Sequence, residues 1–527
     1  MMKPTKTIML KLRFHFGGSL ICWLGILFSF VTATIVRADV RLPAIFSDHM
    51  VLQRDTVVPV WGWAEPGEAV AVSIAGQTKK TIADAAGKWS VKLDKLSAHE
   101  SLTLVVSGKN RITVSDVLVG EVWLGSGQSN MQMWMKSVQD IEQEKAAAKF
   151  PRIRMFTVAR HETVTPQTDC KGAWVICSPE TVETFSATAY FFGRELHQKL
   201  GVPVGLIAAS VGATPIETWT SMEKMKGKKE LAPVFNEWAE KMRVPFDPAK
   251  EQAKYEKQIV AWKTNSAKRV AEGKPAGYAP EKPVPPREHK NYPGNLFNGM
   301  IAPIIPYAIR GGIWYQGENS GREGFAKLYE QQLPLLIADW RERWGQGAFP
   351  FAWVQLANYR EYTNSPSPVS HWARVRDGML KSLAVPNTGM AVAIDIGMTD
   401  NIHPKNKQEV GRRLGLWARA QIYGEKIPYS GPLPAGHKIN GDEITLSFKH
   451  TDGGLAAKDG ELRGFVIADA DKKWHWAKAR IEGEQVIVSS PEVKSPVAVR
   501  YGWADNPKCN LVNGAGLPAS PFRTDDW

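Results

Sequence analysis

The sequence predicts an α/β fold class: a three-layer α/β/α domain with a parallel sheet, flanked on each side by a β-sandwich-type domain. Nearly continuous apolar segments alternate with segments of helical spacing in the middle of the chain. Short alternating strands precede and follow this middle region. The length of 527 residues also exceeds what one compact core normally supports, so several domains are expected.

Residues 1–38 have the form of a signal peptide. Four basic residues precede an apolar run, and Val36-Arg37-Ala38 resembles a cleavage site, so we expect a mature protein that begins at Asp39 and is secreted or periplasmic. An uncleaved membrane anchor is the alternative, because the apolar run approaches spanning length. The leader holds five basic residues and no acidic residue, so its removal lowers the formal charge from +13 to +8.

The mature chain gives no sign of a nucleic-acid partner, because no Lys/Arg run with interleaved aromatic residues occurs. No stable membrane insertion is expected after cleavage, and the oligomeric state is not indicated. Three cysteines remain, Cys170, Cys177 and Cys509. An exported compartment permits a disulfide between the first two, although their spacing does not establish it.

The elements follow one another in three blocks. Residues 39–115 contain short strands such as TVVPVWGWA and LTLVVSG, separated by Gly, Pro and Asp, and predict an N-terminal β-sandwich domain. Residues 116–427 contain buried-strand patterns such as VLVGEVWL and PVGLIAAS and predict the α/β domain. Residues 428–527 return to strands and predict a C-terminal β-domain. Within the α/β domain, the Lys-, Glu- and Pro-rich stretch from about 222 to 292 predicts a helical insertion that forms a solvated flap or rim.

Polar or glycine clusters follow four of the predicted parallel strands. Ser129 follows the first strand in LGSGQSNMQMW, and Gly212 follows PVGLIAAS. Asn319 follows GGIWY, while Asp400 and His403 follow GMAVAIDI. Because open α/β sheets bind ligands beyond the carboxyl ends of their strands, we expect these residues to meet in one site.

These residue types fit ester hydrolysis through a serine. Such a reaction needs a nucleophile, a base, a group that orients the base, and donors for the developing oxyanion. Ser129 is the predicted nucleophile, His403 the base and Asp400 the orienting carboxylate. The backbone N–H groups of Ser129 and Gly212 and the amide of Asn319 are the predicted oxyanion donors.

Several assignments have alternatives. Asp395 and Glu318 are rival carboxylates for Asp400. Gln128 is predicted to contact substrate or to brace the turn beside Ser129. Arg322 is a candidate contact for a sugar carboxylate, because a guanidinium pairs bidentately with that group, or is an ordinary surface arginine. The α/β-hydrolase motif G-x-S-x-G is absent, because Met131 occupies its last glycine position, and no H-E-x-x-H metal motif occurs.

Together these segments resemble the SGNH hydrolases, and specifically the sialate O-acetylesterase family. The resemblance is carried by GQSN, GATPIETWTS, WYQGENS and DNIHP, and extends to FSDHMVLQRD, YPGNLFNGMIAPI and PKNKQEVGRRL. It implies a flavodoxin-like catalytic domain without metal or organic cofactor. One departure is QGENS where family members often read QGESN, but Asn319 still stands two places after Gly317.

Together with the leader, the resemblance implies an exported serine esterase that removes acetyl groups from an acetylated carbohydrate substrate through an acyl-enzyme intermediate. O-acetylated sialic acids are the first candidate substrate, and acetylated xylan or another polysaccharide is the second. A noncatalytic carbohydrate-binding protein is the alternative from another class. A lipase is a weaker alternative, because no long apolar lid segment is present.

Overall fold

The structure is a computed structural model, and it describes residues 39–273, 276–277 and 279–527. The predicted leader lies outside the described residues. No helix in these described ranges is both long enough and apolar enough to cross a membrane.

The centre of the fold is a mixed sheet whose main strands are parallel. The apolar character of these strands follows from burial on both faces. Among the seven strands of the order below, β9, at one edge, runs antiparallel to its neighbour. The order is β13 (Thr388–Val392), β12 (Phe351–Gln355), β11 (Gly311–Tyr315), β7 (Arg111–Gly127), β10 (Val204–Ser210), β8 (Phe150–Thr157) and β9 (Trp174–Cys177). This arrangement confirms the predicted α/β class.

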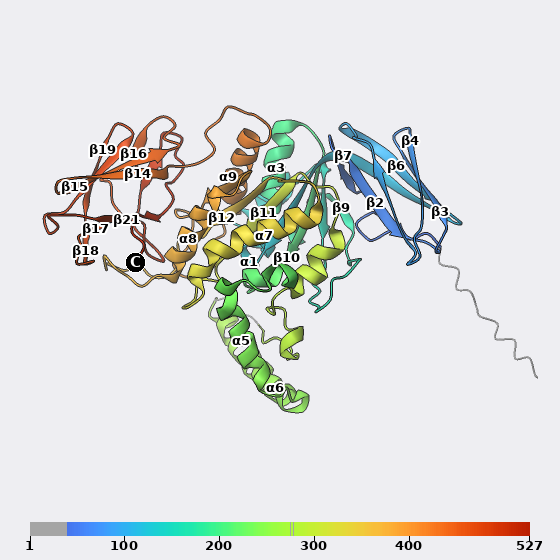
Figure 1. The fold of residues 1–527 in the computed structure, drawn as a ribbon, viewed down its shortest axis with the longest axis horizontal. Helices are drawn as coiled ribbons and strands as arrows, with labels where there is room; N and C mark the ends of the chain where they lie inside the picture. Colours follow the sequence, from blue (N-terminus) through green and yellow to red (C-terminus); the bar gives the residue numbers. More distant parts are fainter. Residues whose placement is uncertain (1–38, 274–275, 278) are drawn as a thin grey trace, which may run out of the picture. The chain divides into compact units, whose positions relative to one another are not determined.

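Helices cover both faces of the sheet (Figure 1). Successive strand residues point to opposite faces, so Trp123 joins one apolar core and Leu124 joins the other. The core around Trp123 includes α3 (Ala187–Leu200) and α9 (Lys407–Gln421). The core around Leu124 includes α7 (Tyr329–Trp344) and α8 (His371–Lys381).

Strand β7 belongs to two parts of the fold. Its first half pairs with β6 (His99–Ser107) and β1 (Val51–Gln53), and its last residues pair with β10 and β11. The strand therefore crosses the predicted boundary between residues 115 and 116 without a linker. The remaining N-terminal strands are β2 (Val58–Trp63), β3 (Ala69–Ile74), β4 (Gln77–Ile82) and β5 (Lys88–Leu93).

The stretch predicted as an insertion contains α4 (Met222–Met225), α5 (Ala232–Arg243) and α6 (Pro248–Ala271). In Figure 1, α5 and α6 project away from the central sheet. Helix α5 buries Val234 and Trp238, whereas α6 has no buried residue, which agrees with its highly charged sequence. Another short helix, α2 (Ile141–Ala147), lies between β7 and β8.

The C-terminal region contains two four-stranded antiparallel sheets that share one apolar core. Their orders are β14 (Leu433–Asn440), β15 (Glu443–Lys449), β20 (Gln485–Ser489), β19 (Lys478–Glu482), and β18 (Trp474–Trp476), β17 (Phe465–Ala468), β21 (Ala498–Tyr501), β23 (Phe522–Arg523). A small pair, β16 (Leu455–Ala457) and β22 (Leu511–Asn513), completes the region. Buried Arg376 of α8 donates to the carbonyls of Ala504 and Asp505 and so ties this region to the α/β domain.

The three cysteines of the described chain are free thiols. The disulfide that the sequence left open between Cys170 and Cys177 is therefore not formed. Burial raises the pKa of both thiols to about 12, so neither is a reactive thiolate at neutral pH.

Candidate active site

Ser129 lies at the point where the order of successive strands reverses across the sheet. It follows β7, which lies between β10 and β11, so the chain leaves β7 toward one side of the sheet and later returns to the other side. Ligands bind at this kind of switch point in open α/β sheets. Gly127 makes the close turn possible: its φ is +139°, and a Cβ there would lie 2.2 Å from the carbonyl oxygen of Tyr315. The short helix α1 (Ser129–Gln132) then begins at the serine itself.

The candidate nucleophile and base are in direct contact. The Oγ of Ser129 lies 2.9 Å from the Nε2 of His403, although 274 residues separate them in the chain. Burial and the positive charge of Lys407 lower the pKa of His403 to about 4. The imidazole is therefore neutral at neutral pH, which is the form that can accept a proton from a serine hydroxyl.

The predicted oxyanion donors lie on the loops beside Ser129. A Cβ on Gly212 would lie 3.4 Å from the Cβ of Ser129, so the glycine allows the β10 loop to approach the nucleophile. In this structure the N–H of Gly212 donates to Oε1 of Gln132 over 2.8 Å. The Nδ2 of Asn319 donates to the carbonyl of Ala213 over 3.2 Å. Both donors therefore have protein acceptors in this structure.

Gln132 was not found from the sequence, although its position carries a signal. It stands three residues after Ser129 in the same helical turn, a spacing that places two side chains on one face. No helix after Ser129 is predicted from the sequence, so Gln132 receives no predicted role.

Gln128 connects the segments that carry Ser129 and Asn319. It is 3% exposed, and its Oε1 accepts from the backbone N–H of Asn319 and from Nε2 of Gln316, each over 3.2 Å. This is the bracing alternative named from the sequence, and it holds the β7 and β11 loops together. A contact between Gln128 and substrate remains a prediction.

Arg322 is engaged with the helical insertion. Its Nη2 donates to Oε2 of Glu237 over 2.7 Å, and its guanidinium lies 3.5 Å from the ring centroid of Phe325. Arg322, the predicted contact for a sugar carboxylate, is thus already paired with the carboxylate of Glu237.

The three rival carboxylates lie in different surroundings. Asp400 is exposed on the bend that precedes His403, and its orienting role remains a prediction. Asp395 accepts from Arg413 through both oxygens, over 2.6 and 2.9 Å. Glu318 is buried, and burial raises its pKa, while a hydrogen bond from Asn130 acts in the opposite direction.

Lys407 is a buried lysine for which the sequence predicts no role. It is the first residue of α9 and is 0% exposed. Its Nζ donates to Oδ1 of Asn130 over 2.8 Å and to the carbonyl of Pro404 over 2.5 Å. The segment PKNKQE reads as a solvated helix start, so only the tertiary structure reveals that this one lysine points inward.

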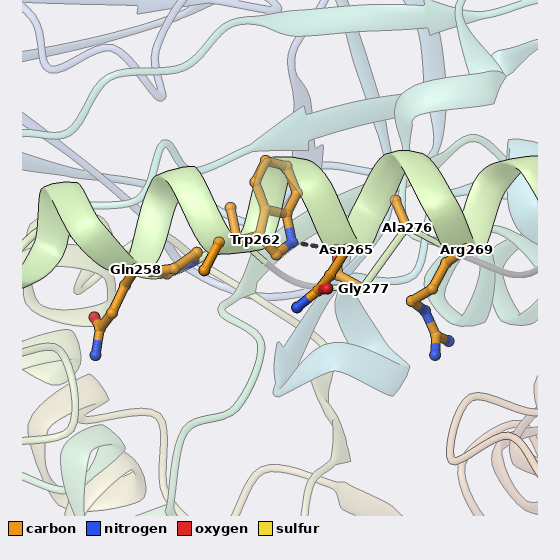
Figure 2. Close-up of a pocket in the computed structure, with 9 residues that line it drawn as sticks. Gln258, Trp262, Asn265, Arg269, Ala276 and Gly277 are labelled. Atoms are coloured by element: carbon orange, nitrogen blue, oxygen red, sulfur yellow. Dashed lines mark hydrogen bonds between the residues drawn. The ribbon is translucent and has the colours of Figure 1, made fainter.

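The open hollow along α6 is unrelated to these residues. It has a volume of about 640 Å³ and is lined by residues that include Gln258, Trp262 and Asn265 (Figure 2). Trp262 donates from Nε1 to the carbonyl of Gly277 over 3.3 Å. None of its lining residues belongs to the four strand-end clusters, so the hollow is not the candidate active site. Across the described chain, no group of three or more His, Cys, Asp or Glu side chains is placed to hold a metal ion.

Known proteins resemble this chain over nearly its whole length. A family model described as carbohydrate esterase, sialic acid-specific acetylesterase, matches residues 290–419. Sialate O-acetylesterase of Mus musculus is 30% identical over 92% of this chain and 94% of its own length, and that of Homo sapiens is 28% identical over 94% and 96%.

A solved structure agrees with these relatives. A carbohydrate acetylesterase from Xanthomonas citri superposes with a TM-score of 0.78 at 36% identity, covering 93% of this chain and all of that one. The chain therefore belongs to the sialate O-acetylesterase family and is a carboxylic ester hydrolase.

Proposed function

We propose that this protein is an exported serine esterase that hydrolyses O-acetyl esters of sugars through an acyl-enzyme intermediate. The observation that carries the proposal is the 2.9 Å contact between Ser129 Oγ and His403 Nε2 at the switch point of the sheet. Membership of an ester hydrolase family supports the reaction type, and the names of the relatives support an acetylated sugar as substrate. The basic and apolar leader supports export.

In the first half of the reaction, Nε2 of His403 takes the proton of Ser129 as Oγ attacks the acetyl carbonyl carbon. The negative charge that develops on the carbonyl oxygen is stabilised by the N–H groups of Ser129 and Gly212 and by the amide of Asn319. Collapse of the tetrahedral intermediate breaks the bond to the sugar oxygen, which receives the proton from His403. The sugar leaves with a free hydroxyl, and the acetyl group stays on Ser129.

In the second half, His403 takes a proton from water, and the resulting hydroxide oxygen attacks the acetyl carbon. Collapse releases acetate and returns the proton from His403 to Ser129. Asp400 is the proposed group that orients the imidazole through its other nitrogen. No step requires a metal or an organic cofactor.

Two substrate classes remain in competition. The family relatives named sialate O-acetylesterase support O-acetylated sialic acids. The ion pair between Arg322 and Glu237 supports acetylated xylan or another neutral polysaccharide. Arg322 is the candidate contact for a sialic acid carboxylate, and Glu237 already neutralises its charge. The carbohydrate acetylesterase from Xanthomonas citri carries a name that fits either class.

Acetate release from a panel of acetylated sialosides, acetylated xylan and acetylated monosaccharides tests the proposal. The wild-type protein should release acetate from at least one class, and Ser129→Ala should abolish release from the same class. Sugar binding without acetate release by the wild-type protein would instead identify a noncatalytic carbohydrate-binding protein.

A further inference from the structure

A buried polar network adjoins the candidate nucleophile and base. Its three side chains come from three separate segments: Asn130 from the turn after β7, Glu318 from the loop after β11, and Lys407 from the start of α9. Asn130 is 1% exposed and Lys407 is 0% exposed. Such a network is costly when any member lacks a partner, so its presence at this place requires an explanation.

The hydrogen bonds of this network reach the residues on both sides of His403. Asn130 donates from Nδ2 to Oε1 of Glu318 and to the carbonyl of Ile402, the latter over 3.0 Å. Lys407 donates to Oδ1 of Asn130 and to the carbonyl of Pro404. The two carbonyls on either side of His403 are thus fixed by Asn130 and Lys407, and Asn130 is itself the neighbour of Ser129.

We propose that Lys407 is a positioning residue of this active site, which acts through Asn130 and the carbonyls of Ile402 and Pro404 to hold His403 at hydrogen-bond distance from Ser129. The inference rests on the proposed function, in which these two residues are the base and the nucleophile. It assigns a catalytic consequence to a lysine that does not touch the reacting atoms.

The charge of Lys407 supports the same role. Burial lowers its pKa to about 7, while nearby Glu318 acts to raise it. Lys407 is therefore protonated throughout the acid range in which His403 titrates. A positive charge beside the imidazole disfavours a second positive charge, so Lys407 helps to keep the base neutral.

The other charged groups near this helix start have partners of their own. Glu318 and His403 are the titratable groups that face Lys407 from the β11 loop and from its own loop, and the buried ring of Tyr315 lies 5.5 Å from its Nζ. In the first turns of α9, Glu409 pairs with Arg412 and Arg413. On the packed helix α3, Arg194 pairs with Glu144, and Glu195 pairs with Arg419 in the last turn of α9.

Three variants separate the positioning role from the charge and from ordinary stability. Lys407→Met removes both the charge and the donor, whereas Lys407→Gln removes the charge and keeps an N–H donor for Asn130. Lys405→Met is the matched control, because Lys405 is exposed, stands two residues after His403, and loses the same formal charge. For each protein, kcat and KM for 4-nitrophenyl acetate are measured from pH 3.5 to 9, together with the melting temperature.

We expect Lys407→Met to lower kcat by about tenfold or more with little change in KM, because the loss falls on the alignment of base and nucleophile. Lys407→Gln should recover part of this kcat. In both variants the acid limb of the kcat/KM profile should move to higher pH, because the imidazole no longer faces a neighbouring cation. Lys405→Met should leave kcat and the acid limb unchanged.

A folded Lys407→Met protein with wild-type kcat and an unmoved acid limb would overturn the inference. A uniform loss at every pH, with no recovery in Lys407→Gln, would also overturn it, because a merely structural lysine behaves in that way. Should Lys407→Met fail to melt cooperatively, Lys407→Gln decides through its acid limb.

The rate at which an organophosphate labels Ser129 gives a second readout that needs no sugar substrate. This rate depends on the same base, so Lys407→Gln should shift its acid limb in the same direction. Normal labelling of the wild-type protein without acetate release from any sugar would reject the proposed substrate class, while the labelling profile of the variants would still decide the role of Lys407.

Discussion

Asn130, the residue directly after the candidate nucleophile, donates a hydrogen bond of 3.0 Å to the carbonyl of Ile402, the residue directly before the candidate base. The two loops that carry Ser129 and His403 are therefore joined by a buried side chain as well as by the dyad itself. In the proposed mechanism, the geometry of the Ser129–His403 pair therefore depends on Asn130, which takes no part in the chemistry.

Asn130→Ala should lower both stability and turnover. It leaves Lys407 and Glu318 without their shared partner, and each buried polar group that loses a hydrogen bond costs about 1–3 kcal/mol. Urea unfolding measures the stability, and kcat for 4-nitrophenyl acetate measures the alignment. Asn440→Ala, at an exposed strand end, is the control: it loses only an exposed hydrogen bond to Thr445, so it should leave turnover unchanged and lower stability less than Asn130→Ala. An Asn130→Ala protein with unchanged free energy of unfolding and unchanged kcat would show that the network positions neither Ser129 nor His403.

Ser129→Ala and His403→Ala should each reduce kcat by several orders of magnitude, and the double variant should lose little more than either one. The two residues share one proton transfer, so once either residue is removed, removal of the other causes little further loss of kcat. Steady-state kinetics of the four proteins of this cycle measure the effect. Multiplicative losses would indicate that the two residues act independently.

The pH dependence should have an unusually low acid limb. Burial and Lys407 lower the pKa of His403 from its ordinary value of 6.5 to about 4, and the base is active above that value. We therefore expect kcat/KM to stay level from neutral pH down to about pH 5 and to fall through about pH 4. An inflection near 6.5 would show that the imidazole is neither buried nor faced by a cation in solution.

The same shift has a consequence for stability. Between pH 6.5 and 4 the unfolded chain binds a proton at this histidine and the folded chain does not, so the free energy of unfolding falls as the pH decreases through this window. In His403→Gln this contribution should disappear, and the slope of unfolding free energy against pH between these values should become smaller. Urea titrations at several pH values provide the measurement. An identical slope in both proteins would contradict the assigned shift.

Gln132 and Asn319 offer a test of the oxyanion site. Asn319→Ala should lower kcat by about 10²–10³ with KM nearly unchanged, because an oxyanion donor acts mainly in the transition state.

Gln132→Glu should also lower kcat, because it places a negative charge at the N–H of Gly212. Gln132→Ala frees that N–H and should not lower kcat. Equal kcat values in the two Gln132 variants would show that the N–H of Gly212 is not an oxyanion donor.

The sequence predicts the parts of this site that follow from chain order. Ser129, Gly212 and Asn319 each stand within a few residues of the end of a parallel strand, and His403 lies on the longer loop that follows β13. Because the carboxyl ends of parallel strands lie on one side of the sheet, the convergence of these residues follows from the alternation of strands and helices. The α/β class is confirmed for the same reason, since continuous apolar strands require cover on both faces.

The features that the sequence could not predict depend on contacts between distant segments. Lys407 looks like any polar residue at a helix start, and its burial depends on the β7 and β11 loops that cover it. The pairing of Arg322 with Glu237 depends on where the helical insertion folds back. The boundary at residue 115 follows a change in hydrophobic pattern, but β7 continues through it because hydrogen bonding to β6 does not depend on how the side chains are patterned.

The most direct test of the central claim is mass spectrometry of the protein quenched during turnover of an acetylated sugar. We predict that the peptide containing Ser129 gains the mass of one acetyl group, that His403→Ala prolongs or prevents this adduct, and that Ser129→Ala never forms it. Undiminished acetate release by a Ser129→Ala protein, with no acetylated peptide in the wild-type digest, would contradict the account.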